Sequence, residues 1–189
     1  VDSLVGSEMC IRDRNYTVTD KADGERKMLY IAPNGHMYMI DTNMNILFTG
    51  VVTRNKELFD SLLDGEHIQY DKKQRFVNLY AAFDIYYIKG KSVRELNFVA
   101  MNESSVPEKF RLPLLNNFVR MLEPISVLDK DSGNSDPSDK HHANAKNKKT
   151  NLCWVQIKCK TFYSSENDNI FNGCKSILTK VHDGSYEYN

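Results

Sequence analysis

The first part of the chain alternates apolar and polar positions with a period of two, which is typical of β-strands. Residues 16–19 alternate β-forming side chains, and 27–31 is a second apolar run. The sequence Pro-Asn-Gly follows at 33–35, and we expect a tight hairpin there because Asn and Gly tolerate positive φ values. Further strands are expected at 36–41 and 45–48, so this part of the chain predicts a β-meander.

A second pair of strands is expected at 61–70 and 76–88, joined by the polar residues 71–74. The run at 76–88 is long and rich in aromatic side chains, as expected of a buried central strand.

Helical periodicity appears later in the chain. The spacing i, i+3, i+4, i+7 predicts a helix that carries Leu115, Phe118, Val119 and Leu122 on one face. Pro113 suits the first turn of this helix, and Pro124 ends it. Strands at 153–157 and 161–163 return to the sheet. A second helix is then expected, with one apolar face formed by Ile170, Phe171, Cys174, Ile177, Leu178 and Val181.

Two segments do not follow these patterns. Residues 1–14 (VDSLVGSEMCIRDR) resemble a translated sequencing-adapter peptide and lack the features of a signal peptide. We expect a non-native or disordered leader there, with a natural exposed leader as the alternative, and a partial domain over 15–189. Residues 129–150 contain no aromatic residue and only Ala as an apolar one, which predicts a mobile surface insertion. The adjacent histidines at 141–142 are expected to face solvent.

Composition and charge narrow the class of protein. The chain has 189 residues, of which 41% are hydrophobic and 26% charged, so it suits one globular domain or part of a larger protein. Lys and Arg number 25 against 25 Asp and Glu, so any nucleic-acid contact must be local. No apolar run approaches the ~18 residues of a membrane helix. The 4 cysteines have no metal-ligand spacing and no dense disulfide framework, which favours a reducing, intracellular compartment.

The most informative motif is Lys-x-Asp-Gly-x-Arg at 21–26, between two predicted strands. A lysine attacks phosphorus only as the neutral amine, so a nucleophilic Lys21 needs cationic neighbours or desolvation to lower its pKa. Arg26 and a divalent cation are candidates for that effect. Asp23 and Gly24 allow a tight turn that brings the Arg fork toward a nucleotide. The alternative interpretation is a charged hairpin on the surface.

Two downstream segments follow this motif in a characteristic order and spacing. Residues 62–68 read Leu-Leu-Asp-Gly-Glu-His-Ile, and 80–87 contain Phe83 and Asp84 in an apolar strand. Together the three segments resemble the covalent nucleotidyltransferase superfamily, which comprises mRNA capping guanylyltransferases and ATP-dependent polynucleotide ligases. The resemblance implies an α+β nucleotidyltransferase fold, C-terminally truncated here, with largely antiparallel sheets and flanking helices.

Within the superfamily, the chain is most similar to capping guanylyltransferases of large DNA viruses. The ligases commonly have Glu two residues before the nucleophilic lysine, where this chain has Thr19. The resemblance therefore implies a guanylyltransferase that forms a lysyl-GMP intermediate from GTP and transfers GMP to the 5′-diphosphate end of RNA. The alternatives are the adenylation domain of an ATP-dependent DNA or RNA ligase, or a catalytically silent scaffold domain.

The resemblance also implies roles for single residues. Lys21 would be the nucleophile, with Asp23 and Gly24 in the nucleotide-binding loop, Arg26 a ligand of the ribose or phosphate, and Glu66 a ligand of the ribose or of a metal-bound water. Phe83 would stack on guanine, a contact worth ~1–3 kcal/mol, whereas the alternative is core packing. Lys160 would read the guanine carbonyl, with Lys158 as its substitute.

The family's metal site is expected to be incomplete here. The resemblance implies a divalent cation, Mg²⁺ or Mn²⁺, whose main carboxylate is expected beyond Asn189, with Glu66 as a possible ligand. The Asp-Gly pair at 183–184 lacks the following apolar run, so we interpret it as the turn that ends a helix. We therefore expect this chain alone to be nearly inactive. Fused or associated triphosphatase and methyltransferase domains are possible partners.

Overall fold

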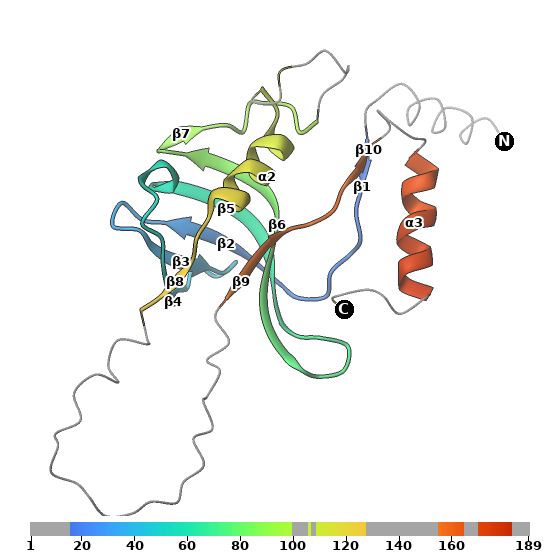
Figure 1. Cartoon of the computed structure of the whole chain (residues 1–189), viewed down its shortest axis with the longest axis horizontal. Helices are drawn as coiled ribbons and strands as arrows, with labels where there is room; N and C mark the ends of the chain where they lie inside the picture. The colour runs from blue at the N-terminus through green and yellow to red at the C-terminus, as the bar shows by residue number, and fades with distance from the viewer. Residues whose placement is uncertain (1–15, 100–105, 107–108, 128–154, 165–169, 183–189) are drawn as a thin grey trace, which may run out of the picture.

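The computed structural model describes residues 16–99, 106, 109–127, 155–164 and 170–182. These residues form one large sheet, one small sheet and two α-helices (Figure 1). The large sheet has the strand order β7-β6-β5-β2-β3-β4-β8, and β9 also pairs with β6. Its strands are β2 (Glu25–Ile31), β3 (His36–Ile40), β4 (Ile46–Val52), β5 (Ser61–Tyr70), β6 (Phe76–Ile88), β7 (Lys91–Ser92), β8 (Ile125–Ser126) and β9 (Gln156–Cys159).

The expected meander is confirmed, because β2, β3 and β4 are antiparallel neighbours. The turn between β2 and β3 differs in one detail from the expectation, since Gly35 has a φ of 83° and Asn34 does not have a positive φ. Asn34 contributes through its side chain, whose Oδ1 accepts from the His36 N–H at 3.1 Å. A Cβ on Gly35 would also lie 2.2 Å from the Thr53 carbonyl oxygen. The turn therefore requires glycine at this position for two reasons, the positive φ and the close approach.

The long hairpin of β5 and β6 has the bounds expected from the sequence. Its pairing shifts register between Asp64 and Gly65, where two residues of β6 oppose one residue of β5. Such a bulge turns side chains from one face of a sheet toward the other. This irregularity lies beside the motif residues of both strands.

The main core lies between one face of the large sheet and helix α2 (Arg111–Met121). The helix was expected here, with Pro113 in its first turn. Leu115 and Phe118 of α2 are buried against strand residues such as Leu29, Leu63 and Ile85. A short 3₁₀ helix, η1 (Lys56–Leu58), adds the buried Leu58 at one edge of this core.

The second sheet lies apart from the large one (Figure 1). It pairs β1 (Thr17–Val18) with β10 (Tyr163–Ser164), and α3 (Ile170–His182) packs on it through Gly173. The expected apolar face of α3 is only partly covered, because Phe171, Leu178 and Val181 are 57%, 68% and 46% exposed. The parallel pairing of β9 with β6 departs from an otherwise antiparallel arrangement.

No helix in the described ranges is both long and apolar enough to cross a membrane. Cys159 and Cys174 are free thiols, and burial raises the pKa of Cys159 to about 11.

Several sequence predictions lie outside the described residues, namely the leader at 1–14, the insertion at 129–150 with its two histidines, and the Asp-Gly pair at 183–184.

Candidate active site

Lys21 lies in the segment that joins β1 to β2, and its side chain is exposed. The next residue, Ala22, is completely buried and packs with Ile68, Leu79 and Ala81 of the β5–β6 hairpin. Among the described residues, none forms a hydrogen bond or ion pair with the Lys21 ammonium group. The loop is therefore fixed to the sheet by one small apolar side chain while the lysine beside it stays accessible.

Gly24 completes the attachment of this loop. Its N–H donates to Glu66 Oε1 at 2.9 Å, and a Cβ on Gly24 would lie 2.6 Å from the His67 carbonyl oxygen. Gly24 lies at a bend just before β2, where a tight turn was expected, although its φ is not positive. The glycine is needed because the loop passes very close to β5, and its neighbour Asp23 remains exposed.

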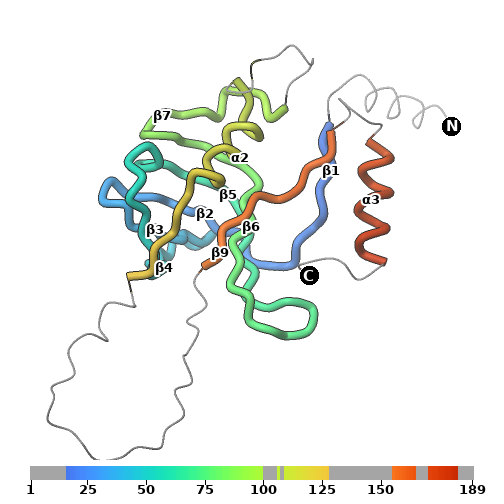
Figure 2. Tube along the Cα trace, viewed as in Figure 1, coloured from blue at the N-terminus to red at the C-terminus, as the bar shows by residue number. Residues whose placement is uncertain are grey.

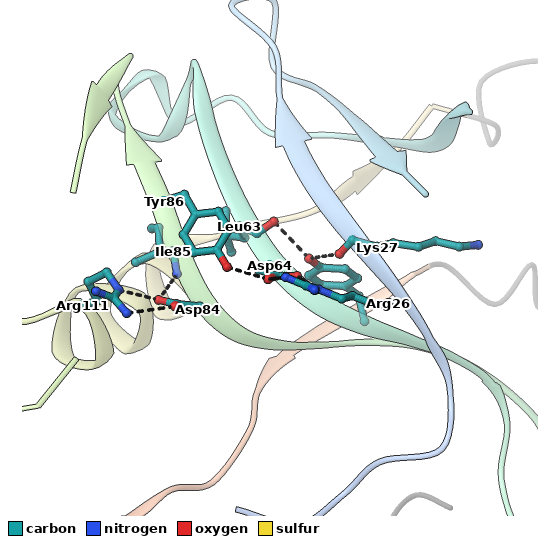
Figure 3. Close-up of polar contacts among 9 residues, drawn as sticks. Arg26, Lys27, Leu63, Asp64, Asp84, Ile85, Tyr86 and Arg111 are labelled. Atoms are coloured by element: carbon teal, nitrogen blue, oxygen red, sulfur yellow. Dashed lines mark hydrogen bonds and ion pairs between the residues drawn. The ribbon is translucent and has the colours of Figure 1, made fainter. Parts of the chain in front are cut away.

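Arg26 forms a two-pronged ion pair with Asp64 (Figure 3). Arg26 Nε donates to Asp64 Oδ1 at 3.1 Å and Nη2 to Oδ2 at 2.6 Å, while the Tyr86 hydroxyl donates to Oδ2 at 2.8 Å. The Asp64 carboxylate is fully buried and raises the pKa of Arg26. Burial and the bond to Asp64 also raise the pKa of Tyr86. One edge of the Arg26 guanidinium is thus occupied by the protein.

Strand register puts these groups on one face of the sheet. Arg26 is opposite Glu66 and Met28 is opposite Asp64 in the antiparallel pairing of β2 with β5. Directly opposed residues share a face, so Arg26, Glu66 and Asp64 project to the same side. The loop that carries Lys21 packs on this side as well, since Glu66 binds Gly24.

The Tyr80 ring of β6 packs closely against Gly65 of β5. A Cβ on Gly65 would lie 2.5 Å from the Tyr80 ring, so only glycine fits above it. The Tyr80 hydroxyl donates to the carbonyl oxygens of Lys27 at 2.9 Å and Leu63 at 3.3 Å (Figure 3). This bridge connects β2, β5 and β6 through the residues next to Arg26 and Asp64 in the sequence.

Phe83 is half-buried and belongs to neither apolar cluster of the described residues. Its neighbours Ala82 and Ile85 are buried in the main core. Phe83 lies at the register shift of β6, next to Asp84. This placement argues against core packing, and the stacking role of Phe83 stays a prediction.

Asp84 is held by the first residue of α2. Arg111 Nε donates to Asp84 Oδ1 at 2.8 Å and Nη2 to Oδ2 at 3.1 Å (Figure 3). The Arg111 guanidinium also donates to the carbonyl oxygens of Arg94 and Leu96. Asp84 therefore holds the start of α2 against β6 through its ion pair with Arg111.

Lys160 is buried, unlike Lys21, with 7% of its surface exposed. Its Nζ donates to the Asp20 carbonyl oxygen at 2.5 Å and lies 3.9 Å from Asp20 Oδ2. Its own N–H donates to the Ala82 carbonyl oxygen at 2.8 Å. Lys160 thus connects the residue before Lys21 to β6, and its role as a guanine reader remains a prediction. Lys158, the substitute, is exposed on β9.

Thr19 reinforces the same connection. Its hydroxyl donates to the Thr161 carbonyl oxygen at 2.7 Å and lies 3.2 Å from Asp20 Oδ1. The residue that separates this chain from the ligase pattern therefore fixes the loop to the segment after Lys160.

The described residues do not make a complete site for a divalent cation. No group of three His, Cys, Asp or Glu side chains comes together within the described ranges. Asp64 and Asp84 are each paired with an arginine, and Glu66 uses Oε1 to accept from Gly24. Glu66 thus remains the candidate ligand on this face among the described residues.

Three residues of the site were not predicted from the sequence: Asp20, Tyr86 and Arg111. Asp20 is adjacent to the motif lysine, and only its pairing with the distant Lys160 marks it. Tyr86 lies two residues after Asp84, on the side of β6 that faces Asp64, and the period of two along a strand is a signal for it. Arg111 had no signal, because its contact depends on how α2 docks.

Comparison with known proteins identifies the family of the chain. A sequence model described as "mRNA capping enzyme, catalytic domain" matches residues 8–108. The chain belongs to the mRNA capping enzyme family. It is also 31% identical over 172 residues to a "Probable mRNA-capping enzyme" of Acanthamoeba polyphaga mimivirus. That alignment covers 89% of this chain and 12% of the relative, so the chain spans a small part of the viral protein's length.

Membership of the capping-enzyme family confirms the expected α+β nucleotidyltransferase fold and the resemblance on which it was based. The matched region includes the Lys21 loop, the β5 motif and Phe83. Lys160 lies outside the region that the family model matches.

Proposed function

We propose that this chain carries the nucleotide-binding and lysine-containing part of an mRNA 5′-capping guanylyltransferase. The observation that carries the proposal is the surroundings of Lys21. The lysine is exposed on a loop attached by Ala22 and Gly24, and it lies within the region that the family model matches. An accessible amine on a fixed backbone meets the positional requirement of covalent catalysis by lysine, and cationic neighbours have to supply the neutral form of the amine.

In the first half-reaction, the neutral amine of Lys21 attacks the α-phosphorus of GTP. A P–N bond forms, the P–O bond to pyrophosphate breaks, and the nitrogen loses its proton. In the second half-reaction, an oxygen of the 5′-diphosphate RNA attacks the same phosphorus and the P–N bond breaks. The nitrogen regains a proton and Lys21 is free again, so the enzyme alternates between a free form and a lysyl-GMP form.

The neighbouring residues support nucleotide binding next to this amine. Glu66 and the unpaired edge of Arg26 lie on the face where the Lys21 loop packs. The pair with Asp64 holds the guanidinium in one orientation, which favours a fixed contact with a ribose or phosphate oxygen. Phe83 offers a half-buried ring for a purine. Membership of the capping family favours GTP over ATP as the nucleotide donor.

A divalent cation is part of the proposal, because phosphoryl transfer needs charge neutralisation around the phosphates. Glu66 is the described residue placed to contribute to its binding. The chemistry supplied by such an ion is stabilisation of negative charge on the phosphate oxygens.

The test uses the native protein that contains this chain. We expect incubation with GTP and Mg²⁺ or Mn²⁺ to produce a covalent GMP adduct that mass spectrometry maps to Lys21. The variant Lys56→Ala is the control and should form the adduct as wild type does, since Lys56 is an exposed lysine of η1 on another part of the surface. Mapping of the adduct to another lysine, or labelling by ATP in preference to GTP, would overturn the proposal.

A further inference from the structure

The tip of the β5–β6 hairpin, residues 69–76, presents two aromatic side chains to solvent. Tyr70 and Phe76 are 49% and 52% exposed and are directly opposed across the hairpin. Their ring centroids are 5.7 Å apart at an interplanar angle of 65°. Both rings lie outside the two buried clusters of the described chain. An edge-to-face pair of this kind leaves ring surface available for a further stacking partner.

The turn between the two rings is rigid. The Asp71 carboxylate accepts from the N–H groups of Lys73 at 2.8 Å and Arg75 at 2.9 Å, and from Arg75 Nε at 2.6 Å. These bonds lower the pKa of Asp71, and the residue is 5% exposed. Gln74 takes a left-handed φ of 60° to close the turn. A preformed turn loses little conformational entropy when it binds a ligand.

Positive charge is concentrated at this tip. Lys72, Lys73 and Arg75 are exposed, whereas Asp71 is the one acidic residue of the segment and is already paired with Arg75. The chain as a whole has a net charge of +0, so the tip is a local basic site on a neutral protein. Basic groups interleaved with exposed aromatic rings are the combination that binds single-stranded nucleic acid.

The tip lies next to the Lys21 loop. A hollow of about 250 Å³ is lined by Asp23, Gly24, Glu25, His67, Gln69, Tyr70 and Gln74. It thus runs from the residues that follow Lys21 to the hairpin tip, which projects beside the segment before β2 (Figure 2). The carboxylates of Asp23 and Glu25 disfavour a phosphate in the hollow, whereas the amides of Gln69 and Gln74 can bond the edges of a base. The phosphates would then lie on the outer, basic side of the tip.

We propose that residues 69–76 bind the single-stranded 5′ segment of the RNA that accepts GMP. Tyr70 and Phe76 stack on bases, and Lys72 and Lys73 neutralise phosphates. The tip is a docking surface that guides the RNA end toward the lysyl-GMP, and it takes no part in forming that adduct. This inference rests on the proposed function, because the acceptor is RNA only if the chain is a capping enzyme.

The experiment measures RNA binding and adduct formation separately in the native protein. The probe is a single-stranded RNA of 10 nucleotides with a 5′-diphosphate, followed by fluorescence anisotropy. The double variant Tyr70→Ala/Phe76→Ala should bind this RNA roughly tenfold or more weakly, because each stacked base contributes to affinity. Phe48→Ala is the aromatic control, since Phe48 is 38% exposed on β4 and lies outside the tip.

A second variant tests the phosphate contacts. Lys72→Gln/Lys73→Gln should lower the slope of log affinity against log salt concentration by about 1.4, the value for two phosphates of a single strand. Lys56→Gln/Lys91→Gln removes two exposed lysines elsewhere and should leave the slope unchanged. Both tip variants should form the GMP adduct at the wild-type rate.

The outcomes separate this inference from the proposed function. If the wild-type protein forms no GMP adduct, the proposed function fails. If the adduct forms normally but both tip variants bind RNA like wild type, the function stands and the docking surface is wrong. Loss of RNA affinity in the tip variants together with unchanged adduct formation supports the inference. Loss of adduct formation in the tip variants would show that the tip serves the first half-reaction, which also overturns it.

Discussion

Lys21 and Lys160 are both marked by the family resemblance, yet the structure gives them opposite surroundings. Lys21 is exposed and has no partner among the described residues, whereas Lys160 is 7% exposed and bonded to the Asp20 carbonyl oxygen. The two meet through one peptide, because Asp20 immediately precedes Lys21. The proposed nucleophile has to be accessible, and the buried lysine binds the backbone immediately before it. Burial therefore distinguishes two lysines that are distant in the sequence and that the fold brings to the same peptide.

The largest effect is expected for Lys21→Ala. Removal of the attacking amine should lower GMP labelling of the native protein by roughly a thousandfold or more. Lys21→Arg should fail equally, because a guanidinium stays protonated. Since Lys21 is exposed, the melting temperature should not change. Labelling that survives in either variant, or a large drop in stability, would break the contrast with Lys160.

Gly24→Ala tests how tightly the Lys21 loop must be held. The added methyl group would lie 2.6 Å from the His67 carbonyl oxygen, so the loop or β5 has to move. We expect the free energy of unfolding to fall by about 1–3 kcal/mol, and GMP labelling to fall with it. Lys56→Ala is the control, because Lys56 is an exposed residue of η1 on another part of the surface. Wild-type stability and labelling of Gly24→Ala would show that the close approach is unimportant.

Lys160→Met tests the buried member of the pair. It keeps the volume but removes the donor to Asp20, whose buried Oδ2 has no hydrogen bond within the described residues. Unfolding free energy should fall by about 2 kcal/mol. Labelling by GTP should also fall more than labelling by ATP, as the guanine-reading role requires. Lys91→Met, at an exposed position of β7, is the control. Equal losses with both nucleotides would make Lys160 a positioning residue only.

The smallest effect concerns His67, which contacts a third lysine, Lys27, on the other face of β2. Its Nζ lies 3.3 Å from His67 Nδ1, and His67 Nε2 lies 2.8 Å from Asn78 Oδ1. Burial lowers the pKa of His67, so the unfolded chain binds the proton more readily below about pH 6.5. Stability should therefore fall as the pH drops below this value. In His67→Gln, measured by urea titration at pH 5.5 and 7.5, this component should disappear. An unchanged difference between the two pH values would contradict the assignment.

Most of the large sheet was predictable from local patterns. The strands β5 and β6 have the expected bounds, because their β-forming runs are long and are separated by a polar turn. The helix α2 was also expected, since its apolar spacing is regular. The incomplete covering of α3 was not, because periodicity reports which face is apolar and says nothing about what packs on it.

The candidate site was predictable in its residues but not in their pairings. The motif spacing marked Arg26 and Glu66, yet it did not show that Arg26 is held by Asp64 or that Glu66 accepts from Gly24. These contacts join residues 38 and 42 positions apart in the chain, and they depend on strand register. Sequence spacing within one segment carries no information about that register.

The contact between Gly65 and Tyr80 has a consequence for how such chains diverge. The Tyr80 ring occupies the space that any side chain at 65 would need. A mutation at either position is therefore constrained by the other, and a larger residue at 65 is tolerated only after the ring at 80 has been lost. Loss of the ring would in turn remove the hydroxyl bridge to Lys27 and Leu63. The two positions should covary among homologues, with a missing glycine at 65 accompanied by a small residue at 80.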